Sequence, residues 1–164
     1  MPYSGNTVLL HQLRLSPLFI IDHNLSYALA DALSACGFDV TSVKAVFPNK
    51  ERVEDEEIID WLEKQGRERS VWITADEKAQ KVHAKYILAK EISVLWVVRP
   101  KNGLSTLKAL QLLSLIIEPL AQLISSTKQP LYLRTSISGK RTKLERLITP
   151  LSDKSLIFKK IPIR

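Results

Sequence analysis

Three groups of acidic residues have the residue type and placement of a divalent-cation site. Asp22 follows the apolar run at residues 19–21, and Asp76 follows the apolar run at residues 71–75. An acidic cluster at residues 54–57 opens a helical pattern between them. The carboxyl ends of buried parallel strands lie along the sheet edge where open α/β folds place their ligands. Carboxylates that meet there from distant parts of the chain would suit a hard cation such as Mg²⁺.

Helical phase distinguishes the acids of the cluster. Ile58, Ile59 and Leu62 define the apolar face of the helix that begins near residue 54. Asp55 precedes them by three, four and seven residues, so it lies on that face, whereas Glu56 points across it. Acids in a first helical turn also gain about 0.3–1 kcal/mol each from the helix dipole. That effect explains an acidic cluster but not an acid on the inward face. Asp55 is therefore the first candidate catalytic and metal-binding residue of the cluster, and Glu56 is the second.

Two polar residues are placed to support these acids. Asn24 could orient Asp22 or a water molecule, and Thr74 could donate a hydrogen bond to a carboxylate or a metal-bound water. The alternative for Asp22 and Asp76 is that each only caps the helix that follows, a role that Asp favours. Asn24 or Ser26 could cap the first of these helices, which would leave Asp22 free for a ligand.

Other reactive residues carry less information. His23 could contact a phosphate or simply lie at the surface, and His11 and His83 have no metal-ligand spacing. Cys36 falls in an apolar helical pattern, and we expect it in the core. A single cysteine excludes an internal disulfide and a cysteine-based zinc site. The sequence contains neither a nucleophile elbow nor a glycine-rich phosphate loop.

The composition indicates one globular domain and no membrane partner. Hydrophobic residues make up 45% of the 164 residues, which is enough for a core. A membrane span needs roughly 18 apolar residues. The nearest stretch, residues 104–124, is interrupted by Lys108, Glu118 and Pro119. The N-terminus lacks a signal-peptide pattern, and a lone cysteine suits a reducing compartment, so we expect a cytoplasmic protein.

The positive charge is concentrated in the last quarter of the chain. Residues 128–164 carry a net charge of +8 and residues 1–127 a net charge of −1, within a total of +7. A basic segment of this kind suits RNA or DNA, because phosphates neutralised by Lys and Arg release counterions. A solvated basic tail is the alternative. The candidate nucleic-acid-binding residues are Lys128, Arg134, Lys140, Arg141 and Lys143.

The elements that would position these residues alternate between strands and helices. Apolar patterns predict four strands, at about residues 18–22, 39–46, 70–74 and 92–98. Helical periodicity predicts three helices between them, at about residues 25–36, 54–65 and 77–90. This order predicts a parallel sheet covered by helices on both faces, with the strand-end acids along one edge.

The pattern changes after Pro100. Residues 104–126 predict one long amphipathic helix, or two helices joined at Pro119. The remaining segments are a strand at 131–137, a turn at 138–140, a return strand or short helix at 143–148, and no clear element at 149–164. At the other end, residues 8–10 could be a short strand or part of a disordered arm.

The chain is therefore expected to contain a single domain with additions at each end. The expected parts are an N-terminal arm (1–17), an α/β core (18–100), a helix plus basic hairpin that completes the same domain (101–148) and a basic tail (149–164).

Four short motifs resemble those of the PIN-like nucleases in their order and spacing. They are Phe-Ile-Ile-Asp-His-Asn-Leu-Ser at 19–26, Cys-Gly-Phe-Asp-Val at 36–40, Val-Glu-Asp-Glu-Glu-Ile-Ile at 53–59 and Ile-Thr-Ala-Asp-Glu-Lys at 73–78. The resemblance covers about residues 18–147. The long helix and the basic hairpin make the chain look most like the VapC-type toxins of that family.

The resemblance implies a three-layer α/β fold with a mainly parallel central sheet of four to five strands. It also implies a ribonuclease that depends on Mg²⁺ or Mn²⁺ and is often silenced by a cognate antitoxin. RNA, an antitoxin and a second copy of the chain are the partners expected. A fourth acid used by many PIN domains has no clear match, and Glu77 is a weak substitute. The family's site acids fall on Asp22 (with Asn24 following), on Asp55 or Glu56, and on Asp76.

Two other classes of function are considered from the residues. A non-catalytic RNA-binding protein on the same fold would use the basic segment without the acids. A receiver-like signalling domain would need a phosphoacceptor acid at the end of a middle strand. The predicted strand at 39–46 ends in Val-Lys-Ala-Val without an acid, which argues against the receiver-like class.

Overall fold

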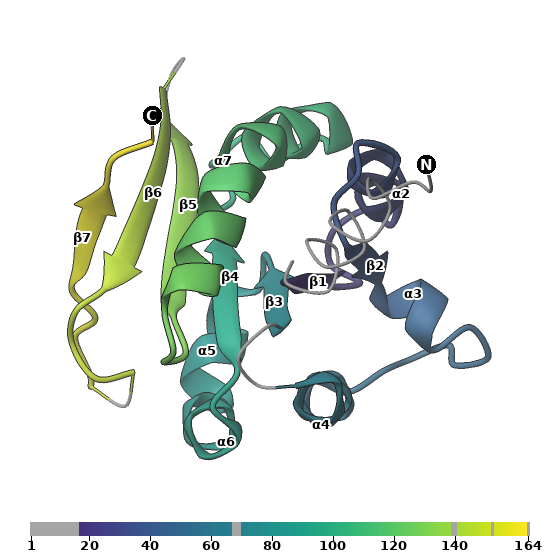
Figure 1. The fold of residues 1–164 in the computed structure, drawn as a ribbon, viewed down its shortest axis with the longest axis horizontal. Helices are drawn as coiled ribbons and strands as arrows, with labels where there is room; N and C mark the ends of the chain where they lie inside the picture. Colours follow the sequence, from purple (N-terminus) through teal and green to yellow (C-terminus); the bar gives the residue numbers. More distant parts are fainter. Residues whose placement is uncertain (1–16, 67–69, 139–140, 152, 164) are drawn as a thin grey trace, which may run out of the picture.

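A seven-stranded sheet runs through the molecule in the order β2-β1-β3-β4-β5-β6-β7 (Figure 1). The computed structural model describes residues 17–66, 70–138, 141–151 and 153–163. The first five strands in this order pair in parallel, and β6 and β7 pair antiparallel. The strands are β1 (Leu18–Ile21), β2 (Val40–Ser42), β3 (Ser70–Thr74), β4 (Ser93–Val97), β5 (Tyr132–Ser138), β6 (Arg141–Leu147) and β7 (Phe158–Ile161).

This sheet confirms the predicted mixed α/β fold with a mainly parallel core. The parallel part has five strands, and the two antiparallel strands raise the total above the four to five expected. Residues 143–148 lie in or next to the return strand β6 rather than in a short helix. β7 was not predicted, because Phe158–Ile161 is a short edge strand between two prolines and shows no alternation of buried and exposed residues.

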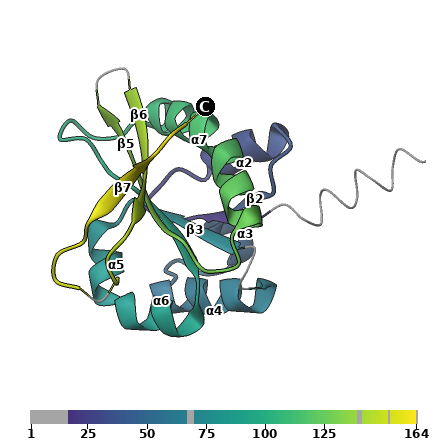
Figure 2. The same cartoon turned by 60° about the vertical axis from the view of Figure 1, so that its left-hand side comes forward.

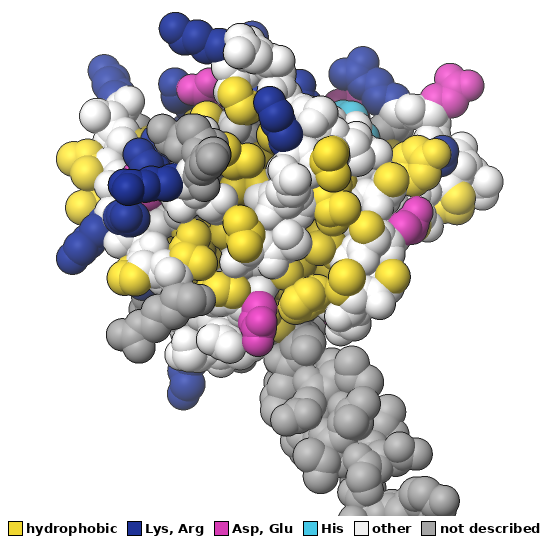
Figure 3. Space-filling model, turned by 90° about the horizontal axis from the view of Figure 1, so that it is seen from above, with side chains coloured by type: hydrophobic (Ala, Val, Ile, Leu, Met, Phe, Trp, Pro, Cys, Tyr) yellow, Lys and Arg dark blue, Asp and Glu magenta, His cyan; other side chains and the backbone are white. Residues whose placement is uncertain are grey.

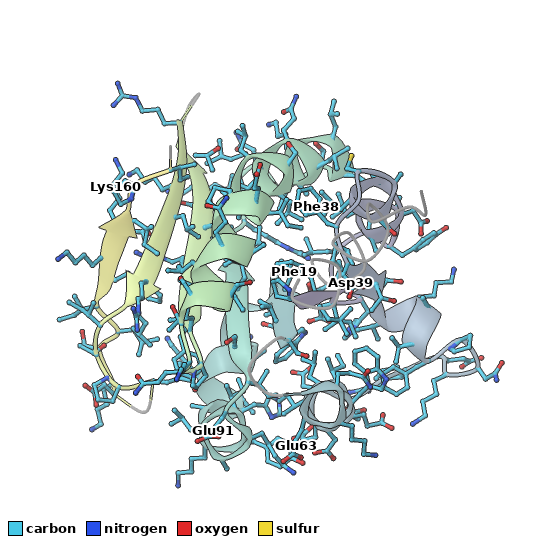
Figure 4. The ribbon with its side chains drawn as sticks, viewed as in Figure 1. Phe19, Phe38, Asp39, Glu63, Glu91 and Lys160 are labelled. Carbon is cyan, nitrogen blue, oxygen red and sulfur yellow. The ribbon has the colours of Figure 1, made fainter. Side chains whose placement is uncertain are left out.

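Helices cover both faces of the sheet and make a three-layer arrangement (Figures 1 and 2). On one face, α2 and α7 pack over an apolar cluster, and on the other α3, α4, α5 and α6 pack over a second cluster. Phe19 and Phe38 lie on the first face, and Glu63 and Glu91 mark the layer of α4 and α6 (Figure 4). The helices are α2 (Ala28–Ala35), α3 (Val43–Val46), α4 (Asp55–Gln65), α5 (Glu77–Val82), α6 (Ala84–Lys90) and α7 (Thr106–Ser126).

The central strands are buried on both sides, which explains their continuous apolar sequences. Every residue of β3 and of β4 is buried. In β3, Val71 and Ile73 point to the cluster beneath α2 and α7, whereas Trp72 points to the opposite cluster. Such strands read as uninterrupted hydrophobic runs in a parallel sheet that has helices on both faces.

The predicted second strand is shorter than its sequence pattern suggests. Residues 43–46 form the helical turn α3, whereas a strand was predicted over 39–46. The turn forms because the Ser42 side chain accepts a hydrogen bond from the backbone N–H of Ala45 at 3.2 Å, as an N-cap does. The Phe47 N–H then donates to the Val43 carbonyl at 2.9 Å.

Two of the predicted helices also differ in their bounds. The helix expected at 77–90 is divided into α5 and α6, with His83 between them. The first helix begins at Ala28, with Tyr27 at the N-cap position and no side-chain capping bond, although Ser26 Oγ accepts from the Ala28 N–H at 3.3 Å. The expectation that Cys36 lies in the core is wrong, because it is exposed at the C-cap position of α2.

Helix α7 is continuous through Pro119 rather than divided into two helices. Its buried stripe continues on both sides of the proline, from Ala109 to Ile124, so packing on the sheet holds the helix together. By length and composition, α7 is the one helix in the described part of the chain that could cross a membrane. Core helices share this property. Leu107 and Leu115 are exposed on α7, and Figure 3 shows hydrophobic side chains gathered on this face.

Three of the sequence predictions rest on residues outside the described ones. These are the short strand or disordered arm at residues 8–10, the turn at 138–140 and the nucleic-acid contact predicted for Lys140.

Candidate functional site

The strand-end acids meet at one edge of the sheet. Asp22 directly follows β1 and Asp76 lies two residues after β3, and these strands pair in parallel with Ile21 opposite Ile73. A cavity of about 280 Å³ opens at this edge. Its lining residues are His23, Asn24, Asp55, Ala75, Asp76 and Arg99.

Asp22 is a buried acid whose two carboxylate oxygens are both hydrogen-bonded. The side chain is 1% exposed. Its Oδ1 accepts from the His23 backbone N–H at 2.6 Å and lies 2.7 Å from His23 Nδ1. Its Oδ2 accepts from Asn24 Nδ2 at 3.0 Å and from Thr74 Oγ1 at 2.7 Å. A buried carboxylate is tolerated only when such donors replace water, so these neighbours keep Asp22 in place.

Asn24 and Thr74 tie the ends of β1 and β3 together. Asn24 Nδ2 donates to Thr74 Oγ1 at 3.0 Å, and Asn24 Oδ1 accepts from the Ala75 N–H at 3.0 Å. Thr74 Oγ1 also accepts from the Asp76 N–H at 3.1 Å. Asn24 thus spans both strand ends and orients Asp22, while Thr74 donates to the Asp22 carboxylate.

Asp76 both lines the cavity and caps α5. Its Oδ1 accepts from the Lys78 N–H at 2.8 Å, so the capping role considered from the sequence is present. The side chain is nonetheless exposed at the cavity, and only one of its oxygens is used by the cap. Capping therefore does not remove Asp76 from the candidate site.

Asp55 stands over the same cavity at the start of α4. Burial raises the pKa of Asp55 first, and the negative charge of Asp22 raises it further, with a smaller contribution from Asp76. His83 and His23 lower the pKa of Asp55 and partly offset this effect. The three predicted acids are thus close enough for their charges to act on one another, as at many functional sites.

His83 lies between the carboxylates of Asp55 and Glu56, and no spacing in the sequence pointed to this contact. Its Nε2 lies 3.2 Å from Asp55 Oδ2, and its Nδ1 lies 3.0 Å from Glu56 Oε1. Asp55 lines the cavity, whereas Glu56 is half exposed and turned toward the far side of the imidazole. Of the two alternatives left by helical phase, the structure therefore brings Asp55 to the other two acids.

Arg99 lines the cavity and is a further residue that sequence reasoning missed. It lies two residues after the end of β4, and its Nη2 donates to the Asn24 backbone carbonyl. The strand-end rule that selected Asp22 and Asp76 would also have selected this position, had it been applied to basic residues. Arg99 places a positive charge beside Asp55 and Asp76.

The donor chemistry suits a hydrated hard cation but not a closed protein cage. Within residues 17–66, 70–138, 141–151 and 153–163, no group of three or more His, Cys, Asp or Glu side chains has an arrangement that could hold a metal ion. Asp22 contributes little to such a cage because four protein contacts already use its oxygens. Asp55 and Asp76 offer carboxylate oxygens to the cavity, and Mg²⁺ commonly binds one or two carboxylates while keeping several waters.

The predicted nucleic-acid-binding residues occupy different places in the fold. Arg134 Nε and Nη2 donate to Glu145 Oε2 at 2.9 and 2.8 Å, and its guanidinium lies 4.1 Å from the centre of the Phe158 ring. Arg134 is therefore committed to the packing of the hairpin strands.

Arg141 and Lys143 are the described members of that set that lie toward the acids. Arg141 pairs with Ser138 at the end of β5, on the edge where the parallel strands end, and both basic side chains are exposed. Lys128 precedes β5 and lies at the opposite edge. Figure 3 shows Lys and Arg concentrated on the side of β6 and β7.

Comparison with known proteins gives one family. No curated protein matches the chain. Residues 17–99 match the model of the PIN-like domain, and this stretch is just over half of the 164 residues and contains all the cavity residues described above. The sheet order, the placement of the acids at its edge and this match lead to one conclusion: the chain belongs to the PIN-like domain family.

Proposed function

We propose that the protein is a metal-dependent endoribonuclease that acts at the cavity between Asp55 and Asp76. The observation that carries the proposal is a cavity lined by Asp55 and Asp76, with the buried Asp22 close enough for its charge to act on Asp55. Burial, and then the negative charge of Asp22, raises the pKa of Asp55, which supports a site shared by neighbouring acids. PIN-like domains commonly occur in nucleases, which supports the reaction class at a coarse level.

Each residue of the site would have a distinct role. Asp55 and Asp76 would hold Mg²⁺ or Mn²⁺ through their cavity-facing oxygens, and Asp22 would add negative charge from below while keeping the loop in place. A bound divalent ion supplies charge stabilisation for a phosphate and a nucleophile derived from water. Arg99 would contact a substrate phosphate, because it lines the same cavity and a guanidinium can bind phosphate oxygens in a bidentate manner.

The basic residues of the β5–β6 hairpin support RNA as the substrate of this cavity, because they would bind its phosphate backbone. Arg141 and Lys143 are exposed near the edge where the acids lie. Cations in this position would neutralise phosphates on either side of the cleaved bond.

The finer proposal is a cytoplasmic toxin with a cognate antitoxin. It rests on the resemblance of α7 and the β5–β6 hairpin to the VapC-type subgroup, a part of the chain beyond the family match. The exposed Leu107 and Leu115 on α7 would serve an antitoxin or a second copy. Expression in a bacterial host should arrest growth, and co-expression of a small protein encoded beside the gene should relieve the arrest. Growth equal to that of an Asp76→Asn strain would contradict the toxin role.

A non-catalytic RNA-binding protein is the second candidate. The observation that favours it is the complete hydrogen bonding of Asp22, together with the lack of a closed metal cage among the described residues. In such a protein, RNA affinity would be unchanged by Asp55→Asn and by chelation of divalent ions.

The decisive experiment measures cleavage of single-stranded RNA in the presence of Mg²⁺ or Mn²⁺. The measurement is repeated after chelation of the ion and with variants that lack one of the acids. Chelation, Asp55→Asn and Asp76→Asn should each abolish cleavage while the circular dichroism spectrum stays unchanged. Asp153→Asn, at an exposed acid outside the cavity, is the matched control and should cleave like the parent. Calorimetry with Mn²⁺ should show weaker binding by both site variants. Equal cleavage by all four proteins would exclude the proposed site.

A further inference from the structure

A second cavity adjoins the acid cavity and shares one wall with it. It has a volume of about 310 Å³ and lies between α3 and the segment that leads into α4. His23 lines both cavities. A ligand that extends from one cavity to the other would therefore pass the His23 side chain, which is 58% exposed.

The floor and one wall of this second cavity are apolar. Val43 and Val53 are 2% and 8% exposed, so they form a fixed floor. Phe47 is half-buried against the same apolar cluster, and Pro48 follows it. The segment is held by backbone hydrogen bonds, since the Lys50 N–H donates to the Phe47 carbonyl at 3.2 Å.

The rim of the second cavity is mainly basic. Lys44, Lys50 and Arg52 lie around it with the acid Glu51, and Arg52 Nε is paired with Glu54 Oε1 at 2.9 Å. Lys50 Nζ lies 5.8 Å from the centre of the Phe47 ring and is paired with Glu57, while Lys44 Nζ lies 4.3 Å from the centre of the Tyr27 ring. A ligand here meets an aromatic ring and an apolar floor with cations above them.

We propose that this cavity holds one base of a single-stranded RNA whose neighbouring phosphate lies at the acids. The inference rests on the proposed function for the direction of the strand. An apolar floor disfavours a phosphate, because a charge there would lose its hydration without a partner. A flat base suits it, since unpaired RNA bases stack on Phe and His side chains. The basic rim suits the backbone on either side of that base.

The size of the cavity and the order of its parts agree with a single nucleotide. Small-ligand pockets begin at about 300 Å³. The apolar floor, the shared His23 wall and the acid cavity follow one another, so a base, its sugar and the next phosphate would occupy them in sequence. The cavity would therefore select the nucleotide next to the cleavage position.

The test measures binding of a fluorescent single-stranded RNA hexamer by anisotropy, in EDTA so that no cleavage occurs. Each hexamer of a series carries a single abasic residue, and its position differs from one hexamer to the next. One abasic position should weaken binding to the parent protein by about 5- to 100-fold, the range for loss of one stacked base. Equal affinity for all abasic hexamers, or no binding of any hexamer, would overturn the proposal.

Protein variants then test whether the loss of affinity at the critical abasic position arises in this cavity. Phe47→Leu should weaken binding of the intact hexamer but not of the hexamer with the critical abasic position, and Phe47→Tyr should restore binding. Phe38→Leu, at a half-buried phenylalanine on the other face of the sheet, is the matched control. Lys44→Gln should weaken both hexamers, and Lys154→Gln neither. If Phe47→Leu weakens both hexamers equally, the base does not stack on Phe47 and the inference fails.

Photocrosslinking supplies a readout that needs no variant. A hexamer with 4-thiouridine at the critical position should attach to a peptide that spans residues 43–53. Attachment only to the hairpin strands would overturn the inference. Because these binding assays contain no divalent ion, a protein that binds the base but never cleaves RNA would keep this inference and lose the proposed activity. A protein that cleaves RNA but binds all the abasic hexamers equally would keep the proposed activity and lose this inference.

Discussion

Thr74 Oγ1 donates a hydrogen bond to the buried carboxylate of Asp22 at 2.7 Å, across 52 positions of the chain. The bond joins the ends of two neighbouring parallel strands at the site. Thr74→Val keeps the shape and removes the donor, which leaves a buried charge with one partner fewer. We expect a loss of about 1–3 kcal/mol in the free energy of unfolding, measured with urea.

The matched control for that change is Thr135→Val. Thr135 is equally buried, but its Oγ1 donates to the neutral Lys143 carbonyl at 2.8 Å. The loss should be smaller, about 0.5–1.5 kcal/mol, because no charge is left behind. Equal losses at the two threonines would show that the Asp22 carboxylate does not depend on Thr74.

The basic residues in and near the hairpin should differ in how much they contribute to the salt dependence of RNA affinity. Arg141→Gln and Lys143→Gln should each weaken binding and reduce the slope of log affinity against log salt by about 1. Lys128→Gln should leave the slope unchanged, because Lys128 lies at the opposite edge of the sheet.

Arg134→Gln should instead lower stability, because it leaves Glu145 without the guanidinium and uncovers Phe158. Its salt slope should equal that of the parent protein. A lower slope for Arg134→Gln, together with unchanged stability, would return Arg134 to the RNA-binding set.

Tyr132 should make the fold sensitive to alkaline pH. Burial, and then the negative charge of Glu91, raises the pKa of Tyr132 from 10.0 to about 12. Because the folded value is the higher one, the folded state holds this proton more tightly, and the resulting stability is present below pH 10 and is lost as the pH rises toward 12. Tyr132→Phe cannot ionise, so the parent should lose stability relative to this variant between about pH 10 and 12.

Urea unfolding at a series of pH values checks this expectation. Tyr27→Phe, at a tyrosine that is 52% exposed, is the matched control and should follow the parent. If the parent and Tyr132→Phe lose stability in parallel above pH 10, Tyr132 is not the group responsible.

Pro119 should weaken α7 although it does not divide it. A proline inside a helix removes one backbone hydrogen bond and costs about 3 kcal/mol relative to alanine. Pro119→Ala should therefore raise the melting temperature, partly offset by the greater freedom of the unfolded chain. Glu118→Ala, at the exposed neighbouring position, should change it little. A lower melting temperature for Pro119→Ala would mean that the sheet packing requires the bend that proline favours.

Local rules predicted the parts of the site that depend on local structure. Asp22 and Asp76 follow buried strands, so the direction of a parallel sheet alone places them together. The phase of α4 placed Asp55 on the inward face, and it does line the cavity. The parallel pairing of β1 with β3 and of β3 with β4 agrees with the parallel sheet that the alternation of strands and helices predicted.

The features that could not be predicted depend on long-range packing and on which of several possible partners a side chain binds. His83 reaches Asp55 only because the chain between α5 and α6 lies against the start of α4, and no spacing in the sequence records that contact. The turn α3 depends on whether Ser42 caps a helix or stays in a strand, and both choices suit its sequence. Arg134 carries the same charge as Arg141, but Glu145 lies opposite it and the Phe158 ring lies against its guanidinium.

The position of α7 has a consequence for synthesis of the chain. The family match ends at residue 99, yet the apolar cluster beneath α2 is completed by side chains of α7 and β5, which come later in the chain. Until those residues leave the ribosome, the nascent chain carries the acids and their strands with one face of the sheet covered by α2 alone and β4 as an open edge. Such intermediates are prone to aggregate. The residues of the candidate site thus lie between Asp22 and Arg99, but the sheet that positions them is fully covered only after α7 and β5 have been made.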